Sequence, residues 1–193
     1  MIDFGAPTFR DLQVPNPLAI GRMTRFVSLM TQSADRRERP NSVPWPPIIF
    51  AAAVAAAVIL GYIHPLGGVV SAGIAVRAIG AVILLAGITL DLAAMREMRR
   101  HRANILPHRA AMALVTSGPF ALSRNPIYLG NTLVMVGAAL LASSLWLLLA
   151  AAAAVLAVWA LAIRREESHL AAQFGDEWTA YTHRTPRWVG FRV

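Results

Sequence analysis

The stretch Leu145–Glu167 reads LWLLLAAAAAVLAVWALAIRREE and decides the fold of this 193-residue chain. Its first 19 residues, 145–163, carry no charge, and the last four are two arginines followed by two glutamates. An α-helix needs about 20 apolar residues to cross a bilayer, where every backbone polar group must be bonded within the segment. The stretch therefore predicts a membrane-spanning helix that ends abruptly at a charged surface.

Three further apolar runs accompany this one, at residues 47–63, 73–95 and 126–142. Short turns join the runs in pairs, at 64–68 and at Ser143-Ser144, and the polar segment 96–125 separates the two pairs. Apolar residues make up 56% of the chain and charged residues 15%, a balance too apolar for a soluble protein of this length. We predict an all-α integral membrane protein with about four transmembrane helices.

The distribution of charge predicts how the chain is oriented. The formal net charge is +8, and nearly all the arginines lie before residue 47, within 96–125 or after residue 163. Arg77 is the exception. Because cytoplasmic loops carry an excess of positive residues, both termini and the central polar segment should face the cytoplasm, at the inner membrane of a bacterium. Arginines spread between spans fit anionic membrane lipid and speak against a nucleic-acid partner.

The Pro-punctuated residues 1–46 form a separate cytoplasmic or interfacial segment, in which Leu18–Met30 has the pattern of an amphipathic helix. Residues 47–193 form the membrane domain. The chain has no cysteine, and its histidines show no ligand spacing with acidic residues, so we predict no metal site. The oligomeric state is left open.

The segment 116–130, TSGPFALSRNPIYLG, is more specific than the apolar runs around it. In a purely structural interpretation, Gly118-Pro119 is a turn, Asn125 caps the next helix, and Pro126 occupies its first position. In a functional interpretation, the free N–H groups at this helix start receive an anionic group, and Tyr128 offers an aromatic face and a hydroxyl. The residues alone favour neither interpretation.

The second specific segment is 164–181, RREESHLAAQFGDEWTAY, which directly follows the last apolar run. As a helix it places Glu167 on a stripe with Ile163, Leu170 and Phe174, which buries one carboxylate among apolar neighbours. Gly175 is a natural point for the helix to stop. The alternative is an ordinary interfacial amphipathic helix whose charges form ion pairs along its surface.

Taken together, the two segments resemble the isoprenylcysteine carboxyl methyltransferase and phospholipid methyltransferase group of membrane enzymes. Its pattern is Arg-His-Pro-x-Tyr-x-Gly, followed one helical hairpin later by a Glu-Glu pair. Here the pattern reads Arg124-Asn125-Pro126-Ile127-Tyr128-Leu129-Gly130 and then Glu166-Glu167. Gly118-Pro119-Phe120 and the stretch from Phe174-Gly175 to Tyr181 resemble the flanking motifs, and the resemblance covers roughly residues 70–190.

The resemblance implies methyl transfer from S-adenosylmethionine in a cytoplasmic pocket built from the central loop and the C-terminal segment. The cofactor-binding residues that it implies are His108, Gly118, Pro119, Phe120, Arg124, Asn125, Pro126, Tyr128, Leu129, Gly130, Glu166 and Glu167. The glutamates would meet the amino group of the cofactor, and Arg124 or the helix start its carboxylate. Phe120 and Tyr128 would flank its adenine or its sulfonium. The implied catalytic residues are Glu167 together with Arg164 and Arg165, which would orient an acceptor carboxylate.

One position departs from the family pattern, because Asn125 replaces its histidine and an asparagine cannot titrate. His108 is a candidate substitute, although a lone loop histidine is usually incidental. A carboxylate acceptor needs no general base, and no strong candidate base is evident in the sequence, which favours a carboxylate or an intrinsically ionisable thiol. The resemblance implies that the acceptor is the carboxylate of an isoprenylcysteine-like substrate. The alternatives are a phospholipid or small-thiol methyltransferase, and, from another class, a non-catalytic small membrane subunit.

Overall fold

The computed structural model describes residues 45–65, 73–103 and 113–189, which belong to one compact unit, 38–193. Their elements are the α-helices α2 (Trp45–Ile63), α3 (Ile74–Arg100), α4 (Pro126–Leu141), α5 (Leu145–Val158) and α6 (Arg164–Arg184), the 3-10 turn η1 (Gly118–Ala121) and the π-helical segment η2 (Trp159–Ile163). These ranges contain no strand, so the predicted all-α class is confirmed. The predicted helix Leu18–Met30 and the N-terminal segment 1–44 lie outside the described residues.

Three helices in these ranges are long and apolar enough to cross a membrane: Pro46–Ile63, Ile74–Arg100 and the continuous helix Leu145–Arg184. The fourth apolar helix, α4, has 16 residues and is shorter than a typical span of about 20. Two helices differ from the expected runs at their charged ends. The helix α3 continues past Met95 to Arg100, and α5 passes through η2 into α6 without a turn.

Glycines bring α3 and α4 into close antiparallel contact. The pairs Gly80–Gly137 and Gly87–Gly130 face each other, and a Cβ atom on Gly87 would lie 2.7 Å from the carbonyl oxygen of Gly130. Without a strong hydrophobic drive inside lipid, close backbone packing at small residues is a main source of helix association. The motif glycine, Gly130, therefore has a packing function, and it also lies against the carboxyl group of Asp91.

The apolar helices α2, α3, α4 and α5 are neighbours in the order α3, α4, α5 and α2. Ser143 and Ser144 form the predicted turn between α4 and α5, where Ser143 adopts a positive φ of 50° and the Ser144 hydroxyl accepts a hydrogen bond from Leu147 N. The indole Nε1 of Trp146 donates to the carbonyl of His64 at 2.8 Å, which ties the start of α5 to the end of α2. The end of α3 and the starts of α4 and α6 consequently gather at the opposite end.

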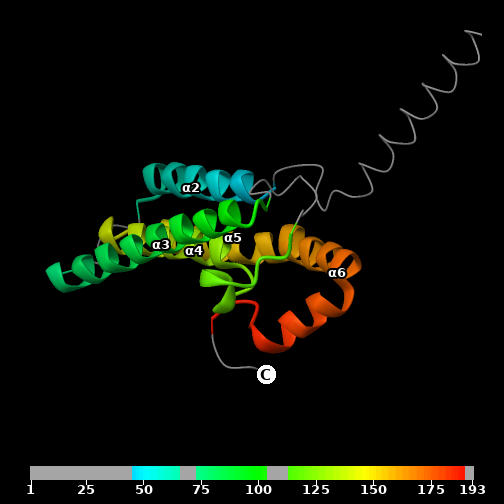
Figure 1. The fold of residues 1–193 in the computed structure, drawn as a ribbon. Helices are drawn as coiled ribbons and strands as arrows, with labels where there is room; N and C mark the ends of the chain where they lie inside the picture. Colours follow the sequence, from blue (N-terminus) through cyan, green and yellow to red (C-terminus); the bar gives the residue numbers. More distant parts are fainter. Residues whose placement is uncertain (1–44, 66–72, 104–112, 190–193) are drawn as a thin grey trace, which may run out of the picture. The chain divides into compact units, whose positions relative to one another are not determined.

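The helix α6 bends sharply at Gly175, as Figure 1 shows. Gly175 has φ 49° and ψ −117°, a conformation that side chains other than hydrogen disfavour. Apart from its chain neighbours and the backbone of its own helix, nothing lies within 4 Å of where its Cβ atom would be, so the backbone and not packing requires glycine here. The predicted helix stop is confirmed as a bend, and the bend turns residues 176–188 back toward the start of α4.

Candidate active site

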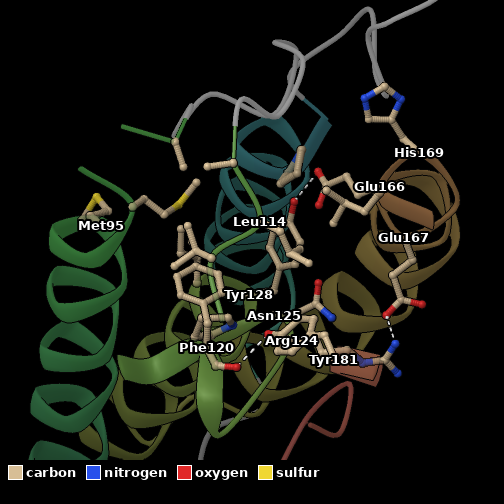
Figure 2. Close-up of a pocket in the computed structure, with 18 of the residues that line it drawn as sticks. Met95, Leu114, Phe120, Arg124, Asn125, Tyr128, Glu166, Glu167, His169 and Tyr181 are labelled. Atoms are coloured by element: carbon tan, nitrogen blue, oxygen red, sulfur yellow. Dashed lines mark hydrogen bonds and ion pairs between the residues drawn. The ribbon is translucent and has the colours of Figure 1, made fainter. Parts of the chain in front are cut away.

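A cavity of about 480 Å³ lies where the starts of α2, α4 and α6 meet the end of α3 and the segment 113–125 (Figure 2). One wall is apolar and comes mainly from Pro46, Pro47, Phe50, Met95, Met98 and Leu114. The other wall is polar and aromatic and includes Phe120, Arg124, Asn125, Tyr128, Glu166, Glu167, His169, Trp178 and Tyr181. Both segments singled out in the sequence thus line this one cavity.

Glu166 and Tyr128 form a partly buried polar contact at the cavity. The Tyr128 hydroxyl donates to Glu166 Oε1 at 2.7 Å, and only 7% of the tyrosine is exposed. The apolar span ends at Ile163, and Glu166 lies in the charged segment that follows. Burial raises the pKa of Glu166 to about 7, in spite of the hydrogen bond from Tyr128 and with a smaller contribution from the neighbouring charge of Glu167. This carboxyl group therefore changes charge near neutral pH.

Glu167 faces a different set of partners, two arginines from distant parts of the chain. Arg187 binds its carboxylate through both Nε, at 3.0 Å, and Nη2, at 2.6 Å. Arg124 Nη1 lies 3.5 Å from the same carboxylate, and its guanidinium lies over the ring of Trp178 at 5.7 Å. Such bidentate pairs fix geometry as well as charge, so Glu167 is held in place.

The segment after the Gly175 bend is hydrogen-bonded to the loop before α4. The Tyr181 hydroxyl donates to the Phe120 carbonyl at 2.7 Å, and the Arg124 amide donates to the Pro186 carbonyl at 2.9 Å. The Arg187 carbonyl accepts from Ser123 Oγ at 3.1 Å and from Asn125 Nδ2 at 3.2 Å. These bonds close the cavity on the side of the C-terminal segment.

The sequence predicted that Asn125 caps α4, but its side chain does not do so. It occupies the N-cap position of α4, but its side chain makes no capping hydrogen bond and instead reaches the Arg187 carbonyl. Pro126 occupies the first turn of the helix, as predicted.

Near Ser117, the loop before α4 is held by contacts with Glu97 at the end of α3. The Ser117 hydroxyl donates to Glu97 Oε1 at 2.6 Å, and His101 and Arg100 contact the same carboxylate, each at 3.3 Å. Gly118 follows with a φ of 58°, and a Cβ atom there would lie 3.3 Å from the Glu97 side chain. Gly118 thus allows the loop to turn close to the Glu97 side chain of α3.

The expected site residues divide into two groups. Those that line the cavity are Phe120, Arg124, Asn125, Pro126, Tyr128, Glu166 and Glu167. Those that do not line it are Gly118, Pro119, Leu129, Gly130, Arg164 and Arg165. His108 lies outside the described residues. Arg164 and Arg165 are exposed, and the Arg164 guanidinium lies over the Trp159 ring at 5.5 Å.

Several residues join the site without having been singled out for it. Trp178 and Tyr181 line the cavity, with their rings edge to face at 5.7 Å, and they had been noted only as part of a resembling motif. Arg187 had been counted among the arginines that set orientation, and His169 had been considered only as a metal ligand. Across the described ranges, no group of three or more metal-ligating side chains comes together.

Comparison with known proteins gives one family. Residues 75–177, more than half of the chain, match the model of the phospholipid methyltransferase family. The chain is also 38% identical over 73 residues to the cobalt-zinc-cadmium resistance protein CzcN of Cupriavidus metallidurans, an alignment that covers 38% of this chain and 33% of that protein. No solved structure matches the chain. The chain belongs to the phospholipid methyltransferase family.

Proposed function

We propose that this protein transfers a methyl group from S-adenosylmethionine to a lipophilic acceptor at the cytoplasmic surface of the bacterial inner membrane. The observation that carries the proposal is Glu166, a partly buried carboxylate that lines an aromatic cavity and whose hydrogen-bond partner is the Tyr128 hydroxyl. Four membrane crossings, with both termini cytoplasmic, would set this cavity at the lipid boundary, and the family match supports methyl transfer as the chemistry.

The residues of the cavity fit the chemical groups of S-adenosylmethionine. Its volume of about 480 Å³ lies within the usual range of about 300–1,000 Å³ for small-molecule sites. Glu166 suits an ammonium group, and the rings of Phe120 and Trp178 suit a sulfonium or an adenine. Arg124 lines the same cavity, and its guanidinium suits a carboxylate. When bound, this cofactor would supply a methyl group on a positively charged sulfur.

The contacts suggest different functions for the two neighbouring glutamates. Glu166 is free to bind the ammonium group, because its other oxygen is not engaged by a positive side chain in the described ranges. Glu167 already binds Arg187 and Arg124, so it orients the Arg124 guanidinium. Tyr128 in turn orients Glu166. Holding two reactants in line supplies up to roughly 7–11 kcal/mol in favourable reactions, and this is the main contribution that these residues make.

The apolar wall suits the hydrocarbon part of the acceptor. Phe50, Met95 and Met98 come from two different helices and line the cavity. The carboxylate of an isoprenylcysteine-like molecule is the acceptor expected from the sequence, with a phospholipid or a small thiol as the alternative. If Arg164 and Arg165 contact an acceptor carboxylate, they do so from the exposed face of α6, because neither lines the cavity.

Binding of S-adenosylhomocysteine to the detergent-solubilised protein, followed by calorimetry, tests the proposal. Glu166→Gln should weaken binding at pH 8 at least about tenfold, since a hydrogen bond to a charged group contributes about 1.5–3 kcal/mol. Glu177→Gln, which changes an exposed carboxylate on the same helix, should leave binding within twofold. No binding to the wild type at millimolar ligand would refute the proposal and favour a non-catalytic membrane subunit.

A further inference from the structure

Between α5 and α6 the continuous helix passes through η2, a turn whose hydrogen bonding is π-helical. There the Arg164 amide donates to the carbonyl of Trp159, five residues earlier, where a regular α-helix would use the residue four earlier. The Arg164 guanidinium also lies over the Trp159 ring at 5.5 Å. Single π turns within α-helices are rare and are often found at functional sites, so a π turn directly before the motif glutamates calls for an explanation.

The buried face of α5 predicts which residues of α6 would face inward if the helix were regular throughout. The buried residues of α5 are Ala151, Ala154 and Val158. Continued at about 3.6 residues per turn, this stripe reaches Arg165. The helix α5 packs against α2 and α4, and residues of both these helices line the cavity, so the stripe and the cavity lie on the same side. A regular α-helix would therefore direct Arg165 toward the cavity.

The observed helix directs the two glutamates there instead. Arg165 is exposed, whereas Glu166 and Glu167 line the cavity (Figure 2). In the preceding turn, Ile163 is buried and Leu161 is exposed. The inward face thus falls about one residue later in the chain than a regular helix would place it. One π turn introduces this displacement, because it contains about one residue more than an α-helical turn.

We propose that η2 is a positioning element, which directs the glutamate pair and not the preceding arginine pair into the cofactor pocket. This inference rests on the proposed function and names the feature of the chain that sets the charge of the pocket. One residue turns an α-helix by about 100°, so in a regular helix Arg165 would take the place of Glu166. A guanidinium would then lie beside Tyr128, where it would repel the ammonium group of the ligand.

Deletion of Ala160, an exposed residue of η2, tests this function. Loss of one residue from a π turn leaves a regular α-helix and keeps the faces on both sides of it in place. The shortened protein should bind S-adenosylhomocysteine within about threefold of the wild type by calorimetry, and its unfolding temperature in detergent should not fall. In a helix that was regular from the start, the same deletion would turn α6 by about 100° and remove Glu166 from the pocket.

A second variant moves the motif without changing the length of the chain. An alanine is inserted directly before Arg164, and the exposed Ala172 is deleted, so that only residues 164–171 move on by one position. Arg165 then takes the place of Glu166. Binding of S-adenosylhomocysteine at pH 8 should fall at least about tenfold, because the carboxylate that faces the ammonium group is replaced by a positive charge.

A rescue separates this effect from simple damage to the helix. In the shifted variant, Arg165→Glu returns a carboxylate to the place of Glu166, while Glu166 itself takes the place of Glu167. Binding should recover to within about fivefold of the wild type, which a misfolded helix could not do.

Loss of binding on deletion of Ala160, or full binding in the shifted variant, would overturn the inference. If the shifted variant does not fold, the deletion of Ala160 decides alone. Absence of binding in the wild type would instead overturn the proposed function itself.

Discussion

The clearest prediction concerns the pH dependence of cofactor binding, because Glu166 changes charge near neutrality. Its pKa is raised by burial from an ordinary value of 4.5 to about 7. At pH 8 about nine-tenths of the protein carries Glu166 as a carboxylate, and at pH 6 about one-tenth does. If the carboxylate binds the ammonium group of the ligand, S-adenosylhomocysteine should bind about tenfold more weakly at pH 6 than at pH 8.

Calorimetric titrations from pH 5.5 to 8.5 measure this effect directly. In Glu166→Gln the change should disappear, because an amide does not titrate in this range. In Tyr128→Phe the midpoint should move to higher pH, because the hydroxyl that stabilises the charged carboxylate is lost. An affinity in the wild type that is constant over the whole range would show that the charge on Glu166 does not hold the ligand, and the assignment would then be wrong.

The same raised pKa determines how stability varies with pH. The folded protein binds this proton more tightly than the unfolded chain, so acidification from pH 7 toward pH 4.5 should stabilise the folded state through this group. The difference between the two pKa values corresponds to about 3 kcal/mol at 1.36 kcal/mol per pKa unit. Comparison of wild type with Glu166→Gln isolates this contribution, since other carboxylates titrate in both proteins.

Two further variants test the packing that surrounds the site. Arg187→Ala removes both hydrogen bonds to a mostly buried Glu167. We expect a loss of about 1–2 kcal/mol in unfolding free energy, moderated by the partial exposure of the arginine, together with weaker cofactor binding. Arg187→Lys should recover part of the stability and part of the binding, and full stability in the alanine variant would contradict the pairing. Gly137→Ala places a methyl group 2.5 Å from Leu84 N and should lower the unfolding temperature in detergent, whereas Gly61→Ala, in ordinary contact with its surroundings, should leave it unchanged or higher.

The membrane helices could be predicted from sequence because lipid imposes a length and an apolar composition on each of them. The turn at Ser143-Ser144 and the bend at Gly175 could also be predicted, because each depends on the residues at that point of the chain and not on distant contacts. The continuation of α3 to Arg100 could not be predicted in this way. Its last turn is polar, and a carboxylate there binds a serine that lies 20 residues further along the chain.

The site could be predicted only as far as local motifs reach. The motif halves contain Tyr128 and Glu166, and their contact follows once both helices start at the same end of the bundle. Arg187 was out of reach, because its contact with Glu167 spans 20 residues and depends on the direction of the chain after Gly175. In the sequence it was one arginine among many near a membrane surface. Arg187 is distinguished from the other arginines by its place beside Glu167 in the folded chain, and not by its residue type.

Arg187 also explains why asparagine serves at the position where the family pattern has histidine. Its guanidinium binds Glu167 in one motif half, and its carbonyl accepts hydrogen bonds from Ser123 and Asn125 in the other half. What the fold requires at position 125 is therefore an N–H donor directed at a carbonyl, and both asparagine and a neutral histidine supply one. Because the Asn125 donor is engaged by the Arg187 carbonyl, we propose that titration at position 125 is not needed for the chemistry.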